Sequence, residues 1–248
     1  PDVKKEGANF RKEVERIFKN KQAYDLRSQP KGVLNGNDLW KIGMRDYNVF
    51  TKKGTASQSD YVAYVLKDGS GSMADDRKDV YATYACSVIE EGLKGIIPLK
   101  ITNFNAGYGS VNHYQIKGFG EEDKTTNYSY NFLNAIKANS GNKDGYSIRV
   151  ATKELLRRNE RDKILFVLSD GLPSVYANAR AGMDDVKEAV KEARKNGIIV
   201  IAILFGSTSF REDSIELYKE MYEKNIISCA PGDISSQLTK TLKKIIVR

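Results

Sequence analysis

Two short segments of this sequence combine oxygen-bearing side chains with glycine in a way that suits metal binding. Residues 68–72 read Asp-Gly-Ser-Gly-Ser, and residues 169–171 read Ser-Asp-Gly. Glycine lets the backbone turn tightly, so Asp68, Ser70 and Ser72 can converge on one point. Carboxylate and hydroxyl oxygens are hard ligands that favour Mg²⁺, Mn²⁺ or Ca²⁺ over zinc and copper. With a single histidine in the chain, a multi-histidine zinc site is excluded.

Each of these segments directly follows a run of residues that reads as a buried β-strand. Residues 61–66 precede the first segment, and the continuous apolar run 164–168 precedes the second. Neighbouring strands lie ~5 Å apart, so two adjacent strand ends can share one ion. We therefore expect Asp170 to face the same crevice as Asp68, beyond the carboxyl ends of the strands where such sheets bind ligands.

The rest of the chain alternates between short apolar runs and longer helical stretches, which predicts a doubly wound, mostly parallel α/β sheet. Strands are expected at residues 61–66, 97–104, 113–119, 164–168, 198–205 and 226–229. Helices are expected at residues 77–93, 128–138, 146–157, 184–195, 214–223 and 234–246.

The two segments together resemble the metal-ion-dependent adhesion site of von Willebrand factor A (VWA) domains. Those domains add threonine from an intervening loop, in a Thr-x-Thr-Gly arrangement that opens a helix. Residues 142–145, Asn-Lys-Asp-Gly, match that loop and place Asn142 and Asp144 at the two threonine positions. The resemblance implies a metal site that joins one or both of them to the ligands from the first two segments, and leaves open which of the two approaches the ion. The alternative for Asp144 is that it only caps the helix that follows.

An Asn-x-Asp-Gly loop is similar to that of cobaltochelatase-type and nitric-oxide-reductase-activation-type VWA proteins, which pair with MoxR-like AAA+ ATPases inside the cell. The resemblance runs from about Tyr61 to the end of the chain, with a weaker match at residues 46–50. It implies a cytoplasmic protein-interaction module rather than an enzyme. A partner's acidic side chain would complete the coordination of Mg²⁺, or of Mn²⁺ or Ca²⁺.

The competing function is a magnesium-dependent phosphohydrolase on a similar sheet, with Asp68 as nucleophile and Asp170 as metal ligand. The haloacid-dehalogenase-type signature would need an aspartate at position 70, where this chain has serine. No Walker lysine and no Gly-x-Gly-x-x-Gly turn is present, so we expect any ATPase to be the partner.

Composition is that of a globular protein, with 40% hydrophobic and 29% charged residues in 248. No apolar run is long enough to cross a bilayer, so no membrane span is expected. The chain opens without Met and without a signal peptide, which favours a fragment of a longer protein. Cys86 and Cys229 lie in apolar contexts and are expected to be buried free thiols, which fits a reducing compartment.

Positive charge is concentrated near the start of the chain. The net charge is +8, of which residues 1–60 contribute +5 from 13 basic and 8 acidic residues. We expect a basic, partly helical arm at residues 1–58, with a helix at residues 10–18, and a VWA domain at residues 59–248. An arm that tethers nucleic acid is the alternative, and nothing beyond charge supports it.

Overall fold

The computed structural model describes residues 2–22, 25–53, 60–107, 109–205, 212–228 and 231–246. Within these ranges, no helix has the length and apolar character that a membrane crossing requires. Cys86 is buried, as expected, whereas Cys229 lies outside the described residues.

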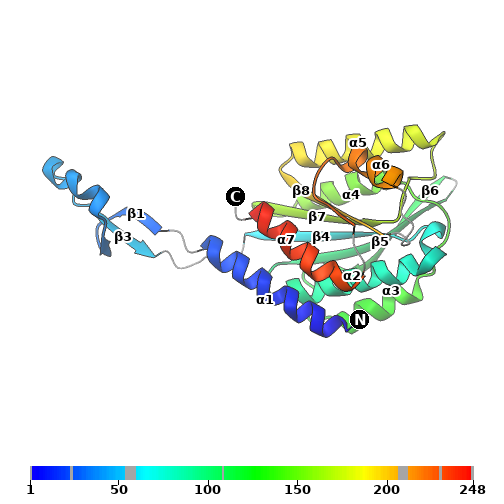
Figure 1. Cartoon of the computed structure of the whole chain (residues 1–248), viewed down its shortest axis with the longest axis horizontal. Helices are drawn as coiled ribbons and strands as arrows, with labels where there is room; N and C mark the ends of the chain where they lie inside the picture. Colours follow the sequence, from blue (N-terminus) through cyan, green and yellow to red (C-terminus); the bar gives the residue numbers. More distant parts are fainter. Residues whose placement is uncertain are drawn as a thin grey trace.

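A six-stranded sheet in the order β6-β5-β4-β7-β8-β9 forms the centre of the molecule (Figure 1). All neighbouring strands run parallel except the edge strand β6, which is antiparallel to β5. The chain passes from β4 to β5 on one side and later returns to β7 on the other, so the strand order reverses at β4. The strands are β4 (Tyr61–Asp68), β5 (Leu99–Gly107), β6 (Ser110–Lys117), β7 (Asp162–Ser169), β8 (Ile198–Leu204) and β9 (Ile226–Ser228).

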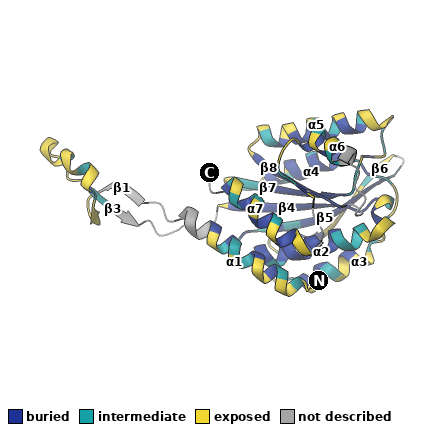
Figure 2. Cartoon of the chain, in the orientation of Figure 1, coloured by how far each residue is buried: buried dark blue, intermediate teal, exposed yellow. Residues whose placement is uncertain are grey.

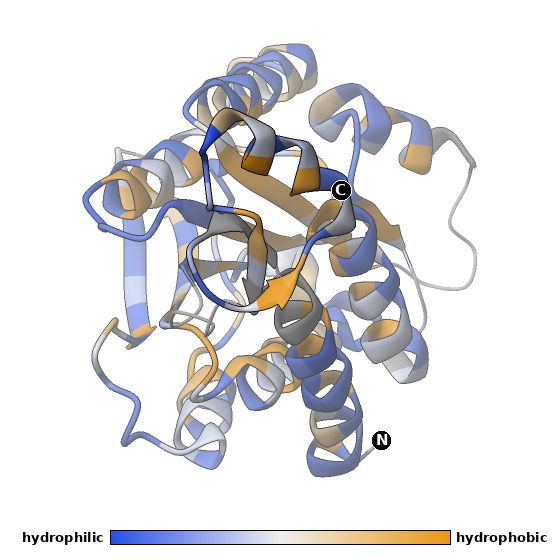
Figure 3. Cartoon of the chain, turned by 90° about the vertical axis from the view of Figure 1, so that its left-hand side faces the viewer, coloured by the Kyte–Doolittle hydropathy of each residue, from blue (hydrophilic) through white to orange (hydrophobic). Residues whose placement is uncertain are grey.

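Helices cover both faces of this sheet and bury its central strands (Figures 1 and 2). In β4, alternate residues enter two different cores: Ala63 and Val65 pack on one face, and Tyr64 and Leu66 on the other. The first face is covered by α1, α2, α3 and α7, and the second by α4, α5 and α6. Figure 3 shows mainly hydrophobic strands behind helices whose residues are mixed. The helices are α1 (Val3–Gln22), α2 (Lys78–Leu93), α3 (Thr126–Ala135), α4 (Asp144–Leu156), α5 (Ala179–Lys195), α6 (Glu212–Tyr222) and α7 (Ile234–Ile246).

The doubly wound α/β fold predicted from the sequence is confirmed, and every expected strand and helix beyond residue 60 is present. The main shifts are at helix starts. For example, α5 begins at Ala179, where Asn178 caps it by accepting a hydrogen bond from the Ala181 amide.

The first helix is longer than the residues 10–18 expected for it. Phe10, Val14 and Ile17 of α1 are fully buried and belong to the same core as α2 and α7. Lys243 of α7 also donates a 2.6 Å hydrogen bond to Glu13 of α1. A separate arm at residues 1–58 stays a prediction, but its helix is part of the α/β core.

Residues 25–53 form a small three-stranded antiparallel sheet that the sequence patterns did not predict. It stands outside the α/β body (Figure 1), and η1 is exposed over most of its length (Figure 2). Consecutive residues Val33 and Leu34 of one strand are both exposed, so neither face of the sheet is covered there. Its elements are β1 (Asp25–Gln29), β2 (Val33–Leu34), η1 (Gly36–Met44) and β3 (Phe50–Lys53).

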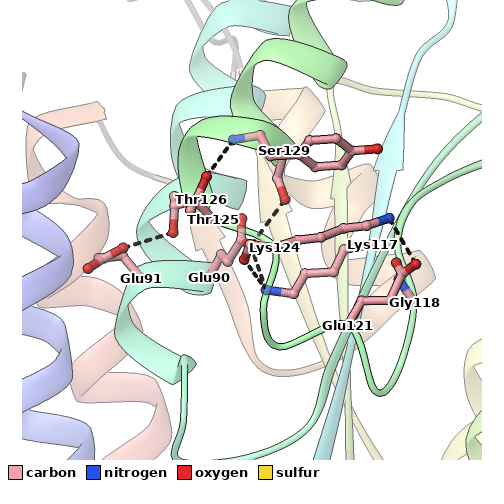
Figure 4. Close-up of polar contacts among 10 residues, drawn as sticks. Glu90, Glu91, Lys117, Gly118, Glu121, Lys124, Thr125, Thr126 and Ser129 are labelled. Carbon is pink, nitrogen blue, oxygen red and sulfur yellow. Dashed lines mark hydrogen bonds and ion pairs between the residues drawn. The ribbon is translucent and has the colours of Figure 1, made fainter.

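A buried ion pair ties β6 and the loop after it to α2 (Figure 4). The Lys117 ammonium lies 2.8 Å from Glu90 Oε1, and the two side chains are 4% and 0% exposed. The Ser129 hydroxyl of α3 donates to the same carboxylate oxygen. Lys117 also donates to the backbone carbonyl of Lys124. This network fixes α3 against the face of the sheet opposite α4.

Candidate metal site

The loops after β4 and β7 meet at the carboxyl edge of the sheet, where the strand order reverses. The Ser72 hydroxyl donates a 3.0 Å hydrogen bond to Asp170 Oδ1. The Ser70 and Ser72 hydroxyl oxygens lie 3.2 Å apart. The Ser70 amide in turn donates to Asp68 Oδ1 at 2.8 Å. The four residues that the sequence placed in these loops therefore form one connected cluster.

Close backbone packing sets the shape of the first loop. The Gly69 amide donates to the Phe104 carbonyl of β5, and the Gly69 carbonyl accepts from the Asn139 amide. A Cβ atom at position 69 would lie 2.3 Å from the Asn103 side chain. A larger residue there would have to displace the buried Asn103 side chain, so glycine lets the loop lie close against β5.

The loop before α4 supplies the two residues between which the sequence could not choose. The Asn142 amide nitrogen donates to Asp68 Oδ2 at 3.2 Å, while its oxygen accepts from both the backbone and the hydroxyl of Ser174 at 2.8 Å. With its oxygen occupied by Ser174, Asn142 orients Asp68. It is less suited to ligating a cation itself.

Asp144, in contrast, is 1% exposed, and neither of its carboxylate oxygens makes a hydrogen bond of normal geometry. Buried carboxylates are normally paired or bound to a metal. Burial, and next the charge of Asp68, raises the pKa of Asp144 well above its ordinary value. The alternative that Asp144 caps α4 is wrong, because Lys143 is the N-cap residue and neither Asp144 carboxylate oxygen accepts a hydrogen bond of normal geometry.

The raised pKa of Asp68 also favours a bound cation at this site. This side chain is fully buried, and burial raises the pKa of its carboxyl to about 6. The nearby charge of Asp170 contributes to this rise, whereas the hydrogen bond from the Ser70 amide opposes it. Asp68 and Asp144 are therefore both costly to ionise in the metal-free protein. A divalent cation between them would stabilise their ionised forms.

The donor set fits Mg²⁺, Mn²⁺ or Ca²⁺, which accept carboxylate and hydroxyl oxygens. Within the described ranges, no three aspartate, glutamate, histidine or cysteine side chains are grouped so that they alone could hold a metal. A cation would therefore also need the hydroxyls of Ser70 and Ser72. Metal binding by these residues stays a prediction. The loop before α4 (residues 142–145) is the third loop of the site, and the geometry favours Asp144 over Asn142 as its ligand.

Sequence reasoning missed three residues that shape the cluster. The Ser169 hydroxyl donates to Asp68 Oδ2 at 3.2 Å, although the sequence pattern assigned this residue no role in the site. Ser174 holds the Asn142 amide through the bonds already described. The Lys78 ammonium lies 2.7 Å from Asp170 Oδ2 and also donates to the Ser72 carbonyl. Of these three residues, only Ser169 could have been suggested by the sequence, because it directly precedes Asp170.

Known proteins resemble this chain in sequence and in fold. No family model matches the chain. The uncharacterized protein YojO of Bacillus subtilis (strain 168) is 29% identical over 255 residues, which cover 94% of this chain and 38% of that protein. The chain therefore spans well under half the length of this relative.

Among solved structures, the vWF domain of the type V pili tip protein Mfa5 from Porphyromonas gingivalis superposes with a TM-score of 0.59 at 10% identity. The match covers 78% of this chain and 98% of that domain. Manganese-loaded TRAP protein from Plasmodium vivax gives a TM-score of 0.57 at 10% identity, with 75% and 74% of the two chains covered. The chain has the fold of VWA domains.

Proposed function

We propose that this chain is a divalent-cation-dependent protein-interaction module. Asp68, Ser70, Ser72, Asp144 and Asp170 would surround Mg²⁺ and leave one position for a carboxylate of a partner protein. The observation that carries this proposal is the unpartnered, buried carboxylate of Asp144 beside the connected cluster of the first two loops. The fold likeness to manganese-loaded TRAP supports the binding of a divalent cation.

Ligand counting leaves room for a partner. Five side chains supply at most five ligands if each binds once, whereas Mg²⁺ takes six in an octahedron at ~2.0–2.1 Å. The exposed side of the site is formed by Ser72, and Asp68 lies at its floor. An acidic side chain that approaches from solvent would meet the cation directly.

The partner that we propose is a MoxR-like AAA+ ATPase, with the chain acting as its cytoplasmic adaptor in a chelatase-like or metalloenzyme-activation system. This rests on the Asn-x-Asp-Gly loop at residues 142–145. Phosphohydrolase chemistry is disfavoured because Asp68 is 0% exposed and its Oδ2 accepts hydrogen bonds from both Asn142 and Ser169. A nucleophile held in this way cannot reach a substrate phosphorus atom.

Capture experiments with the immobilised chain test the module directly. We expect a AAA+ ATPase to be retained from extracts of the cells that encode the chain when Mg²⁺ is present. EDTA should release it, and added Mg²⁺ or Mn²⁺ should restore it. The Asp68→Ala variant should behave like EDTA, whereas Asp184→Ala, which changes an exposed aspartate on α5, should not. Retention that survives both EDTA and Asp68→Ala would show that recognition takes place elsewhere.

Replacing Asp144 with serine tests which residue of the third loop serves the cation. We expect Asp144→Ser to weaken Mg²⁺ binding in calorimetry and to stabilise the metal-free protein by about 1–3 kcal/mol, because an unpaired buried carboxylate is removed. Asn142→Ser should weaken binding less. A metal affinity unchanged by Asp144→Ser would remove Asp144 from the site.

A further inference from the structure

An open groove lies directly beside the proposed cation site. It has a volume of about 790 Å³ and is bounded by the end of β5, the residues that lead into the α4 loop, and residues 174–177 after β7. Ser174 belongs to its wall and also holds Asn142 through hydrogen bonds of 2.8 Å. Hydrogen bonds therefore connect the groove wall directly to the third loop of the site.

Charge in the groove comes from a single lysine. Among the described residues that line it, Lys143 alone carries a charge, and Ala106, Val175 and Tyr176 contribute apolar surface. The Lys143 ammonium lies 5.7 Å from the centre of the Tyr176 ring. In the described part of the chain it pairs with no carboxylate, unlike Lys78 at the start of α2, which pairs with Asp170. An ammonium without a carboxylate partner can attract a negatively charged group into the groove.

Backbone pairing limits how a ligand can bind there. Ala106 and Gly141 face each other across the groove floor and already exchange two hydrogen bonds, of 2.7 and 2.8 Å. Neither is free to add a strand from another protein. A segment in this groove would therefore be recognised through its side chains, and the charge of Lys143 selects for acidic ones.

We infer that the groove receives a short acidic segment of the partner, which presents one carboxylate to the cation and a second to Lys143. Small or apolar residues of that segment would pack against Val175 and Tyr176. The inference rests on the proposed function, because the first carboxylate needs the cation. Beyond that function, we infer that the partner's segment carries two acidic residues and that Lys143 binds the second.

Synthetic peptides provide the test. The probes are blocked glycine peptides with two aspartates separated by glycine spacers of several lengths, and matched peptides with asparagine in place of the second aspartate. In Mg²⁺, we expect at least one two-aspartate peptide to bind the wild-type chain about tenfold more tightly than its matched peptide. Lys143→Gln should abolish this difference without lowering Mg²⁺ affinity, since it removes a positive charge. Lys195→Gln, at the far end of α5, should leave it intact.

Reversing the charge at position 143 provides a second test, in which a new preference should appear. The Lys143→Glu variant should prefer a peptide with lysine at the second position. Equal Mg²⁺-dependent binding of matched peptides to the wild type, or a two-aspartate preference that persists in Lys143→Gln, would overturn the role of the groove and leave the proposed function standing. If no peptide binds more tightly in Mg²⁺ than in EDTA, the proposed function fails together with the inference.

Discussion

Replacing Asp68 with alanine should reduce Mg²⁺ binding below the detection limit of calorimetry. Asp68 is the buried residue on which the cluster converges, since Ser70, Asn142 and Ser169 all donate to it. Ser70→Ala and Ser72→Ala should weaken binding less, because each removes a neutral ligand rather than a charge. The fold should persist, which circular dichroism would verify. Undiminished Mg²⁺ binding by Asp68→Ala would place the cation elsewhere.

The same carboxylate gives the metal-free protein a characteristic pH dependence. The pKa of Asp68 rises on folding from 3.8 to about 6, so the folded state holds its proton more tightly than the unfolded state. Stability contributed by the protonated form is complete below pH 4 and is lost as the pH rises through 6. The loss amounts to roughly 3 kcal/mol at most. Asp68→Asn should remove this part of the profile in chemical denaturation, whereas the part that comes from the raised pKa of Asp144 should remain. Mg²⁺ should offset the loss at pH 7 by binding only the folded state.

Strand ends were the part of the site that sequence could predict. Hydrophobic runs fix where β4 and β7 end, and parallel strands bring those ends together, so the convergence of Asp68 and Asp170 follows from pattern alone. The contact of Lys78 with Asp170 could not be foreseen. It depends on η2 (Gly71–Arg77) and on the left-handed backbone of Asp76 and Arg77, which no periodicity reveals.

The small sheet shows a second limit of pattern reading. Strand prediction relies on alternation between a buried and an exposed face, and this sheet has no covered face at Val33 and Leu34. The helix expected at residues 10–18, in contrast, is present, and Phe10 and Val14, which lie at helical spacing, are buried. Burial against an existing core leaves a signal in the sequence, and an uncovered sheet leaves almost none.

The choice between Asn142 and Asp144 needed tertiary contacts for a related reason. Both residue types supply hard oxygen donors and both suit the start of a helix. What separates them is Ser174, which is 32 residues from Asn142 in sequence and occupies its amide oxygen. A long-range hydrogen bond therefore decides which oxygen remains for the cation.

Loss of the buried Glu90 carboxylate should destabilise the fold more than loss of any side chain of the proposed metal site. Glu90→Ala leaves the Lys117 ammonium, in a side chain only 4% exposed, without its 2.8 Å partner (Figure 4). Removing one member of a buried ion pair typically destabilises a protein by about 3–5 kcal/mol, because the remaining charge is uncompensated, and we expect a loss of that size in urea denaturation. The Ser129 hydroxyl also loses its acceptor.

Two further variants separate the charge from the volume of this side chain. The double variant Glu90→Leu, Lys117→Met should recover most of the loss, since replacing both charges by apolar groups of similar size avoids the unpaired ammonium. Lys124→Ala, which breaks the neighbouring, partly exposed pair with Glu121, should change stability little. A Glu90→Ala protein as stable as wild type would mean that Lys117 reaches water or another carboxylate when Glu90 is absent. A loss in the double variant equal to that in Glu90→Ala would instead assign the effect to packing between α2 and β6.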